Sequence, residues 1–315
     1  MAPDRQRDRG RFALPLLMAL AVASVPVSAV RAQDVTTFKA NVNLVNVFVN
    51  VTDRNGAIVG GLKRDDFKLT EDGRPQIIAV FERQSAIPLS MTLAIDTSGS
   101  VRKDLYAEAD AAEHFVNATL RSQDQMSLMD FATTPREIQP FTNNIKLIDR
   151  GLKRLHGDYA TALYDAVKLA AYRLRGKPGR KVLIVVSDGG DTVSQATYAD
   201  ALEEALRSEV MIYSIIDVPV EASAGRDTGG EHAMITLAEQ TGGKSFYVFD
   251  GGLDKAFEKV SDDLRTQYLL GYYPRNQEKG VDFHRIGVTL PRVAAGQFHI
   301  SHRTGYYTDE TVSAN

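Results

Sequence analysis

The sequence has no cysteine, few histidines and little net charge, and each shortage excludes a class of function. Without cysteine, the 315 residues can hold no disulfide, no catalytic thiolate and no cysteine-bound zinc. The six histidines are scattered, with no pair at His-x-x-x-His spacing, so the sequence predicts no histidine metal site. The net charge is −3, without a long block of one sign, which argues against nucleic acid as the main partner. No glycine-rich phosphate loop with a lysine occurs either, so ATP use is not expected.

The composition is that of a protein with a substantial core. Apolar residues make up 43% of the chain, which is enough to form a core without crosslinks. The length fits one large domain or two modest ones. The chain shows no internal repeat and no low-complexity tract.

The N-terminal segment has the pattern of a secretory signal peptide. Four arginines between positions 5 and 11 precede an apolar run over 12–30, and small residues follow it. We expect residues 1–32 to be this signal, with a cleavage point after Val30-Arg31-Ala32 or after Val27-Ser28-Ala29. The alternative is a retained membrane anchor, because the run is close to the length that spans a bilayer. Prolines and serines dilute the run, at Pro15, Ser24, Pro26 and Ser28.

We therefore expect a cleaved signal and an extracytoplasmic protein, periplasmic or secreted. No second segment is long and apolar enough to span a bilayer, so no membrane span is expected in the mature chain. Secretion without cysteine suits a bacterial protein whose core suffices for stability.

Residues 34–85 are expected to form β structure. Alternate valines from Val45 to Val51 share one face of a strand over 42–51. Asn55-Gly56 predicts a hairpin turn because this pair tolerates positive φ, and 57–62 would return as a strand. Two more short strands are expected over 66–70 and 77–81, joined by a turn at 71–75.

Residues 87–266 alternate between strand and helix patterns. Helices are expected over 103–120, 145–155, 160–175, 198–208, 232–241 and 253–264. Strands are expected over 87–95, 126–131, 137–141, 182–187, 211–216 and 245–249. The β-branched run 182–187 is typical of a central parallel strand buried on both faces. This alternation predicts the α/β class, with a doubly wound, mostly parallel sheet flanked by helices.

The C-terminal tail returns to β patterns over 267–273, 283–290 and 298–302. Neither 34–85 nor 267–307 has enough strands to bury a sheet face well alone. We therefore expect the two segments to pair into one all-β, sandwich-like module, with the α/β domain over 87–266 inserted between them.

An apolar run from Met91 to Ile95 ends abruptly in Asp96-Thr97-Ser98-Gly99-Ser100. A buried strand that opens into a polar loop has this pattern. In open α/β sheets, ligands bind beyond the carboxyl ends of the strands. Alternate residues of an Asp-x-Ser-x-Ser loop can turn one carboxylate and two hydroxyls toward a common point. These hard oxygens suit Mg²⁺ or Mn²⁺ rather than Zn²⁺ or Cu²⁺.

This motif resembles the metal-ion-dependent adhesion site of the von Willebrand factor A-type domain. Two further pieces of that site follow in order, Thr161 within 158–166 and Asp188 after the run 182–187. The β segments on either side contain Asp66-Phe67 followed by Glu71-Asp72-Gly73, and Gln267-Tyr268-Leu269-Leu270-Gly271-Tyr272-Tyr273. These stretches resemble those that flank the A-type domain in a bacterial subfamily of secreted proteins. The resemblance implies that the two serines and the threonine contact Mg²⁺ (or Mn²⁺), while the aspartates act directly or through water. The expected metal residues are Asp96, Ser98, Ser100, Thr161 and Asp188.

The plain alternative is that the five expected metal residues are ordinary capping residues, because Ser and Asp favour helix N-caps. Capping alone does not explain why all five occur together. Two roles are equally compatible with Asp191. It either orients a metal-bound water or hydroxyl, or it is a solvated acid of the loop. Asp217 follows the strand over 211–216 at the same sheet edge, either as part of a binding face or as a turn residue. Asp165 is expected to be a helix-surface acid.

The sequence and the resemblance together predict a secreted, metal-dependent protein-binding module of the adhesion type, and not an enzyme. The resemblance implies that an acidic side chain of a protein partner completes the coordination of Mg²⁺. One rival is a structural envelope-assembly component that binds without metal. The other is a metal-assisted hydrolase, which lacks a visible general base, since Ser98 has no obvious histidine partner.

The last helix of the α/β part, 253–264, runs almost directly into the strand at 267. In related domains this helix can shift when the metal site changes state. The resemblance therefore implies that packing of the β module and affinity of the metal site are coupled.

Overall fold

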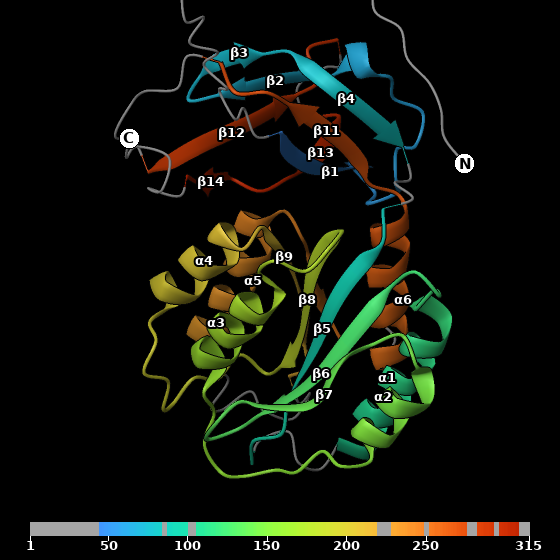
Figure 1. The fold of residues 1–315 in the computed structure, drawn as a ribbon, viewed down its shortest axis with the longest axis vertical. Helices are drawn as coiled ribbons and strands as arrows, with labels where there is room; N and C mark the ends of the chain where they lie inside the picture. The colour runs from blue at the N-terminus through green and yellow to red at the C-terminus, as the bar shows by residue number, and fades with distance from the viewer. Residues whose placement is uncertain are drawn as a thin grey trace, which may run out of the picture. The chain divides into compact units, whose positions relative to one another are not determined.

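The computed structural model describes residues 44–83, 87–99, 105–218, 228–248, 252–275, 282–292 and 296–308. The expected signal peptide, 1–32, lies outside these ranges. Residues 42–315 belong to one compact unit. Its described part contains a six-stranded sheet with helices on both faces and two four-stranded sheets (Figure 1).

The six-stranded sheet is built from the middle of the chain. Its strand order is β10-β9-β8-β5-β6-β7, and every neighbouring pair is parallel except β6 and β7. This confirms the doubly wound, mostly parallel sheet expected from the sequence. The strands are β5 (Leu89–Asp96), β6 (Gln125–Phe131), β7 (Arg136–Thr142), β8 (Arg180–Ser187), β9 (Val210–Ile216) and β10 (Ser245–Tyr247). The helices are α1 (Leu105–Thr119), α2 (Ile145–Leu152), α3 (Leu163–Leu174), α4 (Tyr198–Arg207), α5 (Thr228–Thr241) and α6 (Gly252–Arg265).

Both faces of this sheet are covered by helices. Strand β5 is buried at every position; Leu93 and Ile95 face the core shared with α1, α2 and α6. Ala94 faces the opposite core, shared with α3, α4 and α5 (Figure 1). A fully buried aliphatic side chain contributes about 1.5–3 kcal/mol. Two such cores hold β5 firmly and fix where its carboxyl end opens into the loop after Asp96.

The remaining strands form a sandwich from both ends of the described chain. One sheet has the order β13-β1-β11-β4 and the other β14-β12-β2-β3, so each mixes N- and C-terminal segments as expected. Val47 and Leu270 of the first sheet share one core with Leu69 and Val288 of the second. The strands are β1 (Val45–Asp53), β2 (Lys68–Glu71), β3 (Arg74–Gln76), β4 (Ile78–Arg83), β11 (Tyr268–Tyr272), β12 (Phe283–Thr289), β13 (Phe298–Ser301) and β14 (Gly305–Tyr307).

The prediction of a return strand over 57–62 was wrong. The Asn55-Gly56 turn does form, with Gly56 at φ 80° and the Asp53 carboxylate accepting from two amides of the turn. Beyond it, the chain makes only one β-bridge, from Ile58 to Thr52. Strand β13 pairs with the C-terminal half of β1, and Gly60-Gly61 is a poor strand former. The segment therefore leaves the sheet after this single bridge and its two backbone hydrogen bonds.

The turn expected over 71–75 is shorter than expected. Asp72 and Gly73 have φ of 49° and 77°, as in the two-residue turns that Asp-Gly favours. Strand β3 begins directly afterwards and was not expected, because Arg74 and Pro75 were assigned to the turn. It lies at the edge of its sheet, where a proline is tolerated. Strand β14 was also missed, and the strand expected from 66 begins at Lys68, after a 3₁₀ turn over Arg64–Asp66.

Candidate metal centre

Asp96 is the last residue of β5 and is only 1% exposed. One carboxylate oxygen accepts from the backbone N–H of Ser98 at 2.8 Å. The other accepts from the Ser187 hydroxyl, at the end of β8, at 2.6 Å. Strands β5 and β8 are parallel neighbours, so their carboxyl ends meet at the same edge of the sheet. The carboxylate is thus held between two strand ends.

Burial raises the pKa of Asp96 to about 6. Hydrogen bonds from Ser187 and Ser98 act in the opposite direction, and the charge of nearby Asp188 raises the pKa further. A neighbouring negative charge disfavours the charged form of a buried carboxylate. A cation bound at this edge would offset that cost.

The loop after Asp96 is tied to the segment that carries Thr161. The backbone carbonyl of Thr97 accepts from Asp158 N–H at 3.2 Å, and the Thr97 hydroxyl donates to the carbonyl of His156 at 3.0 Å. A Cβ on Gly99 would lie 3.6 Å from the carbonyl of Tyr159, which shows how closely the two loops approach. Thr161 itself is buried, with 5% of its surface exposed.

Thr161 is in turn held by the loop after β8. Its N–H donates to the Thr192 hydroxyl at 2.9 Å, and its carbonyl accepts from the Thr192 N–H at 2.8 Å. The preceding residue, Asp191, accepts from the backbone N–H of Leu163 at 2.8 Å and from the Ser194 hydroxyl at 2.6 Å. Asp191 therefore caps the first turn of α3, a role not anticipated from the sequence.

Asp188 follows the end of β8 and is half-buried, and its carboxylate accepts from the N–H of Gly190 at 3.0 Å. The chain turns at Gly189, whose φ is 94° and whose Cβ, if present, would lie 2.7 Å from the N atom of Glu231. A glycine is required at this position. The structure thus places the loops of Asp96, Ser98, Thr161 and Asp188 at one sheet edge, while Ser100 lies outside the described residues.

The segment that carries these loops matches a known family. Residues 91–190 match the family model described as von Willebrand factor type A domain. The chain contains a von Willebrand factor A domain. The matched range includes all five expected metal residues.

Several solved structures are similar to part of this chain. An aerotolerance-related membrane protein from Bacteroides fragilis has 18% identity, covers 56% of this chain and 98% of its own, and has a TM-score of 0.46. The protein BatB from Bacteroides thetaiotaomicron has 16% identity, with 56% and 97% covered and a TM-score of 0.46. The vWF domain of the type V pili tip protein Mfa5 from Porphyromonas gingivalis has 14% identity, with 56% and 95% covered and a TM-score of 0.46. No curated protein gave a significant match.

Two further acids of the A domain lie near the expected metal residues. Asp165 is not a free surface acid, because its carboxylate accepts from the N–H groups of Gln195 at 3.0 Å and Ala196 at 2.8 Å. It thereby fixes the loop that also contains Asp191. Asp217 lies at the same edge as the metal residues, with its N–H donating to the carbonyl of Ser187 at 3.0 Å.

Over the described ranges, no helix is both long and apolar enough to cross a membrane.

Replacing Asp191 with alanine is expected to lower the free energy of unfolding by about 1–2 kcal/mol, the usual contribution of a helix cap. The same loop holds Thr161, one of the residues expected to bind Mg²⁺. If that site binds Mg²⁺ as expected from the sequence, its affinity should fall roughly tenfold, as when groups that orient metal ligands are removed. Urea unfolding and calorimetric Mg²⁺ titration measure the two effects. Asp191→Asn keeps an acceptor oxygen and should retain most of both. Lower stability with unchanged Mg²⁺ affinity would show that Asp191 serves α3 alone.

Proposed function

We propose that this chain is a protein-interaction module whose A domain binds Mg²⁺, or Mn²⁺, and through it an acidic side chain of a partner protein. The observation that supports this most directly is the buried carboxylate of Asp96, held at 2.6 Å by Ser187 and facing the charge of Asp188. We also propose the division of the chain made from the sequence. A signal over 1–32 would precede a β module over 34–85 and 267–307, with the A domain over 87–266.

The donor atoms fit a hard divalent cation. Asp96 and Asp188 supply carboxylates, and Ser98, Ser100 and Thr161 supply hydroxyls; the set contains no nitrogen and no sulfur. Oxygen ligands of this kind suit Mg²⁺ and Mn²⁺. A bound ion would supply an electrophilic position that a partner's carboxylate can occupy.

The chain's own contribution is to hold the donors in place. The Ser187 hydroxyl and the Ser98 amide orient the Asp96 carboxylate. Thr192 holds the backbone of Thr161 at two points, because it bonds both the N–H and the carbonyl of Thr161. These contacts come from loops at the ends of buried strands, so a partner would meet a preorganised site on a rigid scaffold.

Asp96→Ala is expected to lower Mg²⁺ affinity at least tenfold, because it removes a carboxylate that no neighbouring group replaces. The direct measurement is calorimetric titration of Mg²⁺ and Mn²⁺ into the purified chain. Asp96→Asn, which keeps the shape and one acceptor oxygen, serves as a second variant, and circular dichroism checks that both fold. Asp262→Ala is the matched control, since Asp262 is an exposed acid of α6 and takes no part in these loops. It should leave Mg²⁺ affinity unchanged.

The partner is tested with the same proteins as bait on the envelope fraction of the source organism. A protein retained in Mg²⁺, and lost with EDTA or Asp96→Ala, supports metal-bridged binding. Capture that is indifferent to both changes would contradict the bridge and favour metal-independent assembly. Metal-dependent turnover of a model ester or phosphoester would favour a hydrolase instead.

A further inference from the structure

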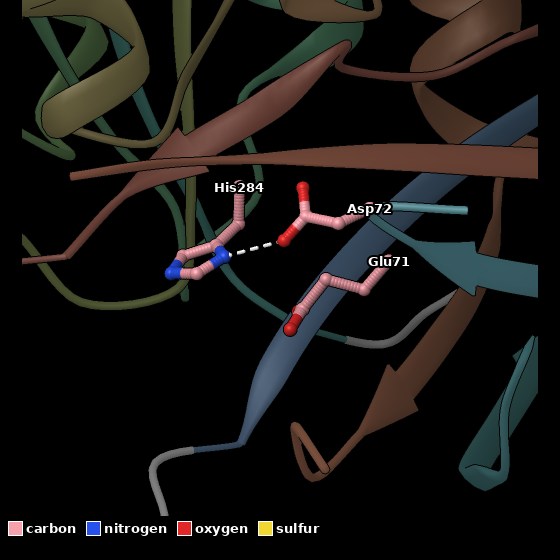
Figure 2. Close-up of side chains that lie close together, drawn as sticks. All are labelled: Glu71, Asp72 and His284. Carbon is pink, nitrogen blue, oxygen red and sulfur yellow. Dashed lines mark hydrogen bonds and ion pairs between the residues drawn. The ribbon is translucent and has the colours of Figure 1, made fainter. Parts of the chain in front are cut away.

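A group of side chains of metal-ligand type lies in the β module, outside the A domain motif. Glu71 ends β2, Asp72 opens the turn that follows, and His284 lies on β12. One ligand atom of each lies within 4.8 Å of the others. His284 Nδ1 and Asp72 Oδ2 are 2.7 Å apart, and Figure 2 shows the Glu71 side chain beside this pair.

Two of the three donors are buried and the third reaches solvent. His284 is 1% exposed and Glu71 is 2% exposed, whereas 37% of the Asp72 side chain is accessible. An ion could therefore enter past Asp72 and be held from within by the other two side chains. A carboxylate and an imidazole buried side by side are typical of a built site rather than of a chance surface pair.

Glu71 is buried without a lysine or arginine partner in the described ranges. One of its oxygens accepts from the hydroxyls of Tyr272 at 2.5 Å and Tyr306 at 2.8 Å. Burial raises the pKa of both tyrosines above the ordinary value, and the bond to Glu71 adds to this, so both remain donors. Outer hydrogen bonds of this kind orient the ligands of metal sites. Both of these donors to Glu71 are hydroxyl groups, and neither is a cation.

A purely structural role explains part of this cluster. Asp72 stands at φ 49° in its turn and accepts from Arg285 N–H at 2.8 Å, so it has a conformational task. Its contact with His284 is also a plain ion pair when the imidazole is protonated. Neither accounts for a third ligand-type side chain, Glu71, buried next to that pair. Donors of one ion at about 2.0–2.2 Å each would lie about 3–4 Å apart, which the observed spacing nearly meets.

We propose that Glu71, Asp72 and His284 bind a second divalent cation, and that the cation is a transition metal such as Zn²⁺. An imidazole nitrogen with two carboxylates suits Zn²⁺ better than Mg²⁺, in contrast to the all-oxygen set of the A domain. The site would join the hairpin after β2 to β12, and hence the two chain segments that form the module. Metal binding to the folded state would then stabilise the module.

The test is Zn²⁺ titration of the full chain, freed of metal by chelation, with one site expected. Glu71→Gln keeps the size of the side chain and an acceptor for both tyrosines, and should lower Zn²⁺ affinity at least tenfold. His284→Gln should do the same. Zn²⁺ should raise the unfolding temperature of the unsubstituted chain and leave that of both variants unchanged. Co²⁺ gives a visible absorption band for the same comparison.

Two control variants make the result specific. His299→Ala removes an exposed histidine of the same module and should bind Zn²⁺ as before, which excludes adventitious surface binding. Asp96→Ala should lose Mg²⁺ and keep Zn²⁺, so failure of this proposal and failure of the proposed function are distinguishable. Equal Zn²⁺ affinity in the unsubstituted chain and in Glu71→Gln, or no Zn²⁺ binding at all, would overturn the second site.

Discussion

Replacing Asp263 with alanine is expected to lower the free energy of unfolding by about 3–5 kcal/mol, the cost of removing one partner of a buried charged pair. Asp263 lies on α6 and is 3% exposed. It pairs with the Lys244 amine, and it accepts from Asn50 at 2.5 Å and from the Tyr213 hydroxyl at 2.7 Å. The alanine variant leaves all three donors without this acceptor, and each buried, unsatisfied polar group carries its own penalty.

Guanidinium unfolding with two variants measures this effect. Asp262→Ala is the matched control, because this neighbouring acid is exposed and should change stability by no more than about 0.5 kcal/mol. Asp263→Asn keeps the shape but not the charge, so an intermediate loss is expected. A loss below about 1 kcal/mol for Asp263→Ala would mean that the network contributes little beyond packing.

A second large loss of stability is expected from Gly179→Ala, at roughly 3 kcal/mol or more. Gly179 has φ 75°, and a Cβ there would lie 2.0 Å from the carbonyl oxygen of Pro88. That carbonyl accepts from the N–H of Arg180 at 2.9 Å, next to the first pairing of β8 with β5. The added methyl must push these strands apart where the central sheet begins.

Gly176 separates the steric cost from the conformational one. Its φ is 73°, nearly the same, yet a Cβ at this position would have nothing within 4 Å. Gly176→Ala should therefore cost only about 1–2 kcal/mol, the penalty of a left-handed alanine. Thermal or urea unfolding of the two variants gives the comparison. Equal losses would show that the β8 end relaxes around the methyl group.

The central sheet was predictable because its signals are local. The run 182–187 is apolar almost throughout and becomes a strand buried along almost its whole length. The polar loop after Ile95 marks a strand end, and parallel strands bring such ends to one edge. The loops of Thr161 and Asp188 could be assigned to the same site only through the family resemblance, since they follow different elements.

The features that were missed depend on contacts between distant segments. Asp72 and His284 are 212 positions apart. The pairing of β2 with β12 brings them together, and the local sequence of neither strand predicts that pairing. The capping role of Asp191 depends likewise on α3 beginning next to its loop. The burial of Arg180 also depends on distant segments. An arginine at the start of a strand is expected to be exposed, yet only 5% of Arg180 is exposed. It donates to the Gln267 side chain at 2.6 Å.

The pairing of β4 with β11 places both connections of the A domain side by side. Arg83 pairs with Tyr268 in antiparallel register, so the chain leaves the β module toward β5 and returns from α6 at neighbouring points. Asp96 lies at the far end of β5 from this junction. A pulling force on a partner held there would run lengthwise along the parallel strands. Because Arg83 ends β4 and Tyr268 begins β11, the force would pull both strands in the same direction from the same end, and the two connections would share the load.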